Sequence, residues 1–158
     1  MIVDEVAEAI EAGQPAIVPV DTVYGLVASV YTSAPARAVY RLKGRPESQP
    51  AALMASDLDL LFECVPELRG RAGTIARALL PGAYTLVLPN PSRRFRWITG
   101  ERPETIGVRV PVLEGDARGL LDRVGAVMAT SASLSGGPEP RTLAEVPDEL
   151  KAACAVLD

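Results

Sequence analysis

Histidine is absent from the 158 residues of the chain. Its absence excludes Ser-His-Asp and Cys-His catalysis, two-histidine zinc sites and acid-base catalysis by imidazole. The two cysteines, Cys64 and Cys154, are too few for a disulfide framework or a four-thiolate metal site, and we expect both to be small buried residues. Any chemistry must therefore come from lysine, arginine, carboxylates, hydroxyls, backbone amides or a bound ion.

Long apolar runs are missing as well. The apolar residues come in short runs between proline, glycine and charged residues, whereas a membrane span needs roughly 18 to 20 consecutive apolar residues. The first five residues carry two acids and no base, which is unlike a signal peptide. We therefore expect a cytoplasmic protein without membrane association, folded as a single domain over residues 1–158.

The net charge of −4 argues against a protein whose main task is to coat nucleic acid, because such binding needs a positive surface. A local basic patch is still compatible with this charge. Residues 90–102 form a basic loop that carries Arg93, Arg94, Arg96 and Arg102. This loop either contacts RNA phosphates or is simply solvated.

Helix and strand patterns alternate along the chain. Apolar spacing and breakers predict helices over residues 3–12, 34–42, 57–64, 74–80 and 115–123, with a further helix after Pro147, and strands over residues 16–20, 27–30, 50–55, 86–88, 105–110, 126–130 and 154–157. Ser33, Asp57 and Thr74 are the expected N-caps. The alternation predicts an α/β protein with a helix-covered mixed sheet.

Lys43-Gly44-Arg45-Pro46 places two cations one residue apart at the end of an expected helix. The glycine between them lets the backbone approach a ligand, so the segment suits a phosphate or a carboxylate. The alternative is a pair of solvated cations that meet the negative end of the helix dipole. The sequence contains neither a Walker-type phosphate loop nor Gly-x-Gly-x-x-Gly.

Three further places carry polar groups next to apolar strands. Residues 130–137 hold four hydroxyls and two glycines, which suit either phosphate oxygens or an ordinary turn. Arg109 lies within an apolar strand, where it is either paired or turned to solvent. Asp21, Thr22 and Tyr24 either position an amine or a metal ion or bond local backbone.

Five segments, read in order, resemble the successive motifs of the YrdC family: PVDTVYGL (19–26), KGRP (43–46), LPGAYTLVL (80–88), TIGVRVP (105–111) and SASLSG (131–136). The likeness runs from about residue 10 to 146. It implies a YrdC-like twisted sheet of parallel and antiparallel strands, with flanking helices and a central concave cavity. It also implies a nucleotidyltransferase that condenses L-threonine, bicarbonate and ATP into threonylcarbamoyl-adenylate, which feeds the threonylcarbamoyl modification of tRNA adenosine 37.

The resemblance also implies roles for particular residues. The matching positions are Lys43, Arg45, Ser131 and Ser133 for catalysis and nucleotide binding, Thr105 and Arg141 for nucleotide binding, and Val20, Thr22, Tyr24 and Arg109 for amino-acid binding. Mg²⁺ would arrive with ATP, and no tightly bound metal is expected. The partners that the resemblance implies are tRNA or double-stranded RNA and other proteins of the same modification pathway.

Three positions depart from the usual family pattern. Ala83 stands where the family usually has the second proline of Pro-Gly-Pro. Val20 stands where the family usually has threonine, and Ser133 stands where it often has asparagine. The alternative reading is therefore a divergent YrdC-like paralogue that binds a nucleotide or double-stranded RNA without this activity.

Overall fold

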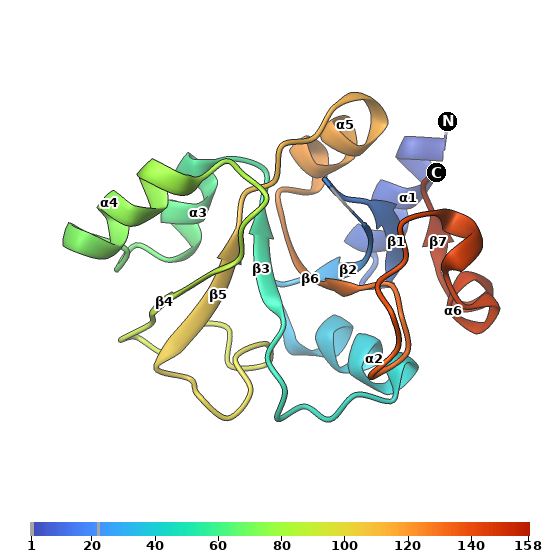
Figure 1. Ribbon diagram of the computed structural model, residues 1–158, viewed down its shortest axis with the longest axis horizontal. Coiled ribbons are helices and arrows are strands. Elements are labelled where there is room, and N and C mark those ends of the chain that lie inside the picture. The colour runs from blue at the N-terminus through green and yellow to red at the C-terminus, as the bar shows by residue number, and fades with distance from the viewer. Residues whose placement is uncertain (1, 22) are drawn as a thin grey trace.

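The computed structural model describes residues 2–21 and 23–158, and a sheet of seven strands organises them (Figure 1). The strands are β1 (Ala16–Pro19), β2 (Tyr24–Ser29), β3 (Ala52–Ala55), β4 (Leu86–Pro89), β5 (Thr105–Arg109), β6 (Ala126–Ser131) and β7 (Ala155–Val156). Their order is β4-β5-β3-β6-β2-β1-β7. The pairs β3/β5 and β1/β7 are parallel and the others antiparallel, which confirms the expected mixed sheet.

Six α-helices and one 3₁₀ turn flank this sheet in the described residues. They are α1 (Ile2–Glu11), α2 (Ser33–Lys43), α3 (Leu58–Cys64), α4 (Gly70–Leu79), α5 (Gly115–Val124), η1 (Leu143–Glu145) and α6 (Asp148–Ala153). None of them is long and apolar enough to cross a membrane.

The helix ends partly follow the expected caps. Asp57 accepts a 2.8 Å hydrogen bond from the amide of Leu60, as an N-cap should. Two cap predictions are wrong. Thr32, in an extended conformation, precedes α2, so Ser33 is already helical. Helix α4 begins at Gly70, and Thr74 lies inside it, where its hydroxyl bonds the carbonyl of Gly70.

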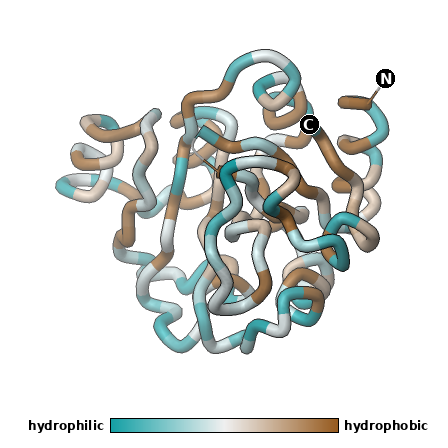
Figure 2. The backbone as a smooth tube through the Cα atoms, turned by 45° about the vertical axis from the view of Figure 1, so that its right-hand side comes forward, coloured by the Kyte–Doolittle hydropathy of each residue, from teal (hydrophilic) through white to brown (hydrophobic). Residues whose placement is uncertain are grey.

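Two apolar clusters cover the two faces of the sheet. The larger cluster joins the sheet to α2, α3 and α4, and the smaller joins it to α1 and α5. Figure 2 shows hydrophobic segments in the interior strands and mostly hydrophilic loops at the lower edge. Cys64 and Cys154 are free and only half-buried, so the expectation that both are buried is wrong.

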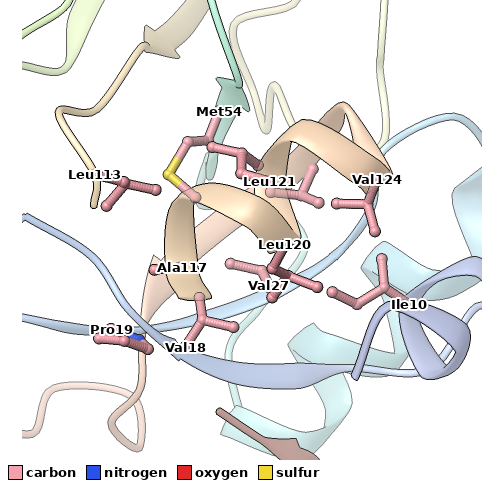
Figure 3. Close-up of a pocket in the computed structure, with 11 residues that line it drawn as sticks. Ile10, Val18, Pro19, Val27, Met54, Leu113, Ala117, Leu120, Leu121 and Val124 are labelled. Atoms are coloured by element: carbon pink, nitrogen blue, oxygen red, sulfur yellow. The ribbon is translucent and has the colours of Figure 1, made fainter. Parts of the chain in front are cut away.

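Helix α5 packs on part of the second face through a continuous apolar layer (Figure 3). Leu120 and Leu121 of α5 meet Val18, Val27 and Ile10 from the sheet and α1. The gap left between them is about 10 Å³ and has only apolar lining. A space of this size without polar partners does not hold a water molecule, so this layer is core packing.

Beyond α5 the same face continues with much smaller side chains. The strand register places Ala129 beside Ala52, and Ala52 beside Gly107. Gly25 lies next to Ser131 in the neighbouring row. Because alternate residues of a strand point to one face, these small residues form a floor on which a cavity can open.

Candidate functional site

Two adjoining chambers lie on this floor of small residues. The larger chamber, about 380 Å³, is lined by Ser48, Pro50, Ala51, Ala52, Thr85, Val87, Thr99, Glu101, Arg102, Thr105, Gly107, Ala129 and Thr130. The smaller chamber, about 180 Å³, is lined by Val20, Val23, Gly25, Ala52, Thr85, Arg109, Ala129, Thr130, Ser131 and Glu139. Four lining residues are common to both, so the two chambers adjoin.

Lys43 is buried next to Ser131, which lines the smaller chamber, and only 3% of the lysine is exposed. Its Nζ donates to the carbonyl of Ser131 and lies 3.5 Å from the hydroxyl of the same residue. Burial first, and then the charge of Arg45, lower the pKa of Lys43 to about 8. The alternative of a solvated cation at a helix end is therefore wrong for Lys43. Gly44, in the left-handed conformation, ends α2 at this point, and Nζ of Lys43 bonds to Ser131 at the end of β6.

The hydroxyls of Ser131 and Ser133 lie 2.8 Å apart. The amide of Ser135 donates to the carbonyl of Lys43, which fastens the small-residue loop to the end of α2. Ser133 is 4% exposed, whereas Ser131 lines the smaller chamber. The loop and the basic segment, far apart in the sequence, thus form one polar corner.

Arg45 reaches the floor from the other side of Gly44. Its Nη1 donates to the hydroxyl of Thr130, and its Nη2 donates to the carbonyl of Pro50. Thr130 lines both chambers and Pro50 the larger one. The partners of Lys43 and Arg45 in these hydrogen bonds are neutral oxygens, so no carboxylate neutralises either cation through these contacts.

Arg109 projects from β5 into the smaller chamber and is paired. Its Nη2 lies 2.9 Å from Oδ1 of Asp21, and the two side chains are only 17% and 9% exposed. Nε of Arg109 and Oδ2 of Asp21 are buried and lack hydrogen-bond partners. Of the two expected environments for Arg109, the paired one is present.

The other sequence-predicted residues are not all brought together. Val20 lines the smaller chamber, where a Cβ added at Gly25 would lie 2.9 Å from its Cγ2. Thr105 lines the larger chamber. Thr22 lies outside the described residues.

Tyr24 and Arg141 lie apart from the chamber linings. Tyr24 precedes Gly25 and therefore faces the opposite side of the sheet, where its hydroxyl bonds Oδ1 of Asp158. Arg141 is exposed and does not line either chamber.

Two lining residues and one ion-pair partner were not predicted from the sequence. Glu139 lines the smaller chamber and raises the pKa of Lys43 against the larger effect of burial. Thr85 lines both chambers. It lies in segment 80–88, which resembles a family motif but gave no prediction for this residue. Asp21 was considered alone, although its partner lies 88 residues away. No local signal reveals that pairing.

Metal ligands are sparse in the described part of the chain, where no group of three or more carboxylates or thiolates could hold an ion.

Relatives of the chain were found by sequence. A family model named Sua5_yciO_yrdC, with the description "Telomere recombination", matches residues 8–158. The threonylcarbamoyl-AMP synthase of Stenotrophomonas maltophilia (strain K279a) is 32% identical, and the alignment covers all of this chain and 86% of that protein. A relative from Mycobacterium tuberculosis is 35% identical to this chain. The alignment covers 84% of this chain but only 60% of the length of the relative.

Solved structures give the same grouping. Sua5 of P. abyssi complexed with L-threonine superposes with a TM-score of 0.86 at 29% identity, over 98% of this chain and 45% of that one. E. coli YciO, at 24% identity and a TM-score of 0.81, shares the fold over 98% of this chain and 75% of its own. The match over residues 8–158 and the full-length alignment to the S. maltophilia protein show that the chain belongs to the Sua5/YciO/YrdC family.

Proposed function

We propose that the chain is a threonylcarbamoyl-AMP synthase, a nucleotidyltransferase that joins L-threonine, bicarbonate and ATP. The observation that carries the proposal is the corner where Lys43 and Arg45, bonded only to neutral oxygens in the contacts given above, meet Ser131 and Thr130 at the chamber walls. Proteins named for this activity are 30 to 35% identical to the chain.

The proposed reaction has two steps. The threonine nitrogen forms a bond to the carbon of bicarbonate, with loss of water and a proton, to give a carbamate. A carbamate oxygen then forms a bond to the α-phosphorus of ATP, while the bond from that phosphorus to the bridging oxygen breaks and pyrophosphate leaves. Negative charge builds on phosphate oxygens during the second step, where fixed cations stabilise it most.

The chambers divide the substrates between them. Lys43 and Arg45 would hold the phosphates, with Ser131 and Ser133 as hydroxyl partners, and Thr105 would contact the nucleotide in the larger chamber. Arg109 would bind the threonine carboxylate in the smaller chamber, against Val20. Enclosure of both ligands would protect the carbamate from water. Mg²⁺ enters as part of the nucleotide, and tRNA would receive the threonylcarbamoyl group in a later reaction.

The test is pyrophosphate release by the purified chain with ATP, threonine and ¹⁴C-bicarbonate. We expect release that requires all three substrates, together with a labelled adenylate on chromatography. Omission of threonine or its replacement by glycine measures the background. Threonine-independent release, or no release with all three substrates present, would contradict the proposal.

A further inference from the structure

Four cationic side chains lie in or directly beside the chamber walls. Arg102 and Arg109 line the chambers, whereas Lys43 and Arg45 bond to residues that line them. Arg102 forms an exposed ion pair. Arg109 forms an ion pair with Asp21, whereas the ion pairs among described residues include neither Lys43 nor Arg45. Both unpaired cations lie at the corner made by α2 and the end of β6. The site therefore has a positive corner and a wall of low net charge.

The ion pair is built to hold Arg109 in one orientation. Nη2 of Arg109 donates a hydrogen bond to Oδ1 of Asp21, and Nε of Arg109 is buried without a partner. A ligand can therefore reach the guanidinium from the side that faces the smaller chamber. Asp21 itself does not line the smaller chamber in the described residues. It acts on the chamber through Arg109.

The charges around the smaller chamber match a zwitterion better than a simple anion. An isolated guanidinium would attract every anion, including the triphosphate of a nucleotide. Asp21 cancels most of that attraction, and Glu139 adds a second carboxylate at the same chamber. An amino acid offers a carboxylate to Arg109 and an ammonium to the surrounding negative charge.

We propose that Asp21 is a positioning and specificity-determining residue, which orients Arg109 and makes the smaller chamber select zwitterionic amino acids over carboxylates and polyphosphates. The inference rests on the proposed function, since it names what selects the amino-acid substrate. In this role Asp21 acts through Arg109 and not on the reacting atoms. The triphosphate is left to Lys43 and Arg45.

The experiment measures binding rather than turnover. Calorimetric titration compares L-threonine with 3-hydroxybutyrate, which keeps the hydroxyl and carboxylate but lacks the ammonium, and with inorganic pyrophosphate. We expect the wild-type chain to bind threonine at least tenfold more tightly than 3-hydroxybutyrate. In Asp21→Asn that ratio should fall to about one, while pyrophosphate binding tightens several-fold because Arg109 is no longer neutralised.

Two variants serve as controls. Asp21→Glu keeps the charge and should restore part of the preference for threonine. Asp122→Asn removes an exposed i,i+4 ion pair with Arg118 on α5 and should leave all three affinities unchanged. Circular dichroism melting confirms that each variant is folded.

The outcomes are separable. A wild-type chain that binds neither threonine nor 3-hydroxybutyrate contradicts the proposed function. Equal binding of the two ligands by the wild type overturns the inference about Asp21, even if Asp21→Asn cannot be folded. An unchanged ratio in folded Asp21→Asn overturns it as well.

Discussion

One face of the sheet has a covered half and an open half, and the two differ in side-chain size. Along β2, β3 and β6 the large residues Val27, Met54 and Val127 lie under α1 and α5. Two positions away on the same face, each strand changes to a small residue, at Gly25, Ala52 and Ala129, and the chambers open there. Packing and ligand binding are thus separated by a single two-residue step on each strand.

The largest effect is expected in the open half, for Lys43→Met. The variant keeps a long apolar stem but removes the charge proposed to stabilise the phosphate, so we expect turnover to fall by roughly two to three orders of magnitude. Folding should be retained, because replacing a buried charge by an apolar side chain of similar volume is often neutral or stabilising. Pyrophosphate release and urea unfolding measure the two properties.

Lys151 is the matched control, as the only other lysine of the sequence. It lies on α6, 3.3 Å from Asp148. Lys151→Met should retain wild-type turnover. A loss of stability of several kcal/mol in Lys43→Met would mean that Lys43 mainly supports the fold.

Leu120→Ala tests the covered half. Leu120 is 3% exposed in the apolar layer beneath α5 (Figure 3), and truncation of such a leucine costs about 2–5 kcal/mol of unfolding free energy. Turnover per folded molecule should be unchanged. Leu79→Ala, at a leucine 40% exposed on α4, should shift stability by less than about 0.5 kcal/mol. Substrate affinity that falls in Leu120→Ala would show that the two halves are coupled.

Gly107→Val fills the open half. A Cβ at Gly107 would meet Cγ2 of Thr85 at 3.5 Å and the carbonyl of Ala51 at 3.9 Å, which are ordinary contacts. The strand should accept valine, which favours β-structure, while the side chain occupies the larger chamber. We expect the KM for ATP to rise about tenfold with stability unchanged or raised.

Gly119→Ala is the control for this substitution, since the added methyl on α5 meets nothing within 4 Å. It should raise stability by about 0.4–1 kcal/mol and leave the KM unaltered. A wild-type KM in Gly107→Val would remove the larger chamber from the proposed nucleotide site.

Alkaline pH should weaken the positive corner gradually. Because the pKa of Lys43 is lowered to about 8, its charge is lost as pH rises through that value, and kcat should fall about tenfold per pH unit above it. In Lys43→Arg, whose guanidinium stays charged, that fall should disappear.

The contribution of Lys43 to the unfolding free energy should rise with pH, whereas kcat falls. Between about pH 8 and 10.5 the unfolded chain binds the Lys43 proton more strongly than the folded chain, so the contribution of Lys43 to unfolding free energy rises with pH. Urea unfolding midpoints of the wild type and of Lys43→Met, measured across this pH range, isolate the contribution of Lys43 to the unfolding free energy. A kcat profile that declines equally in Lys43→Arg would assign the alkaline loss to another group.

Local sequence predicted most of the fold but less of the site. Apolar periodicity located the helices and strands, because burial depends on neighbours three, four or two residues apart. The start of α4 was missed because Thr74 is a common N-cap residue that here bonds back to Gly70 within the helix. Lys43 and Arg109 were found as residues, but their burial and their partners Ser131 and Asp21 depend on contacts 88 residues apart.

The smallest effect is expected for Tyr24→Phe, which tests a residue that the family resemblance links to the amino acid. The Tyr24 hydroxyl donates a 2.8 Å hydrogen bond to Asp158, and this bond raises the pKa of Tyr24. Loss of one exposed hydrogen bond should cost about 1 kcal/mol or less. The KM for threonine should change less than twofold, because Tyr24 points to the face opposite Gly25 and the chambers. A tenfold rise in that KM would place Tyr24 in the amino-acid site, and would require the segment around it to rearrange when threonine binds.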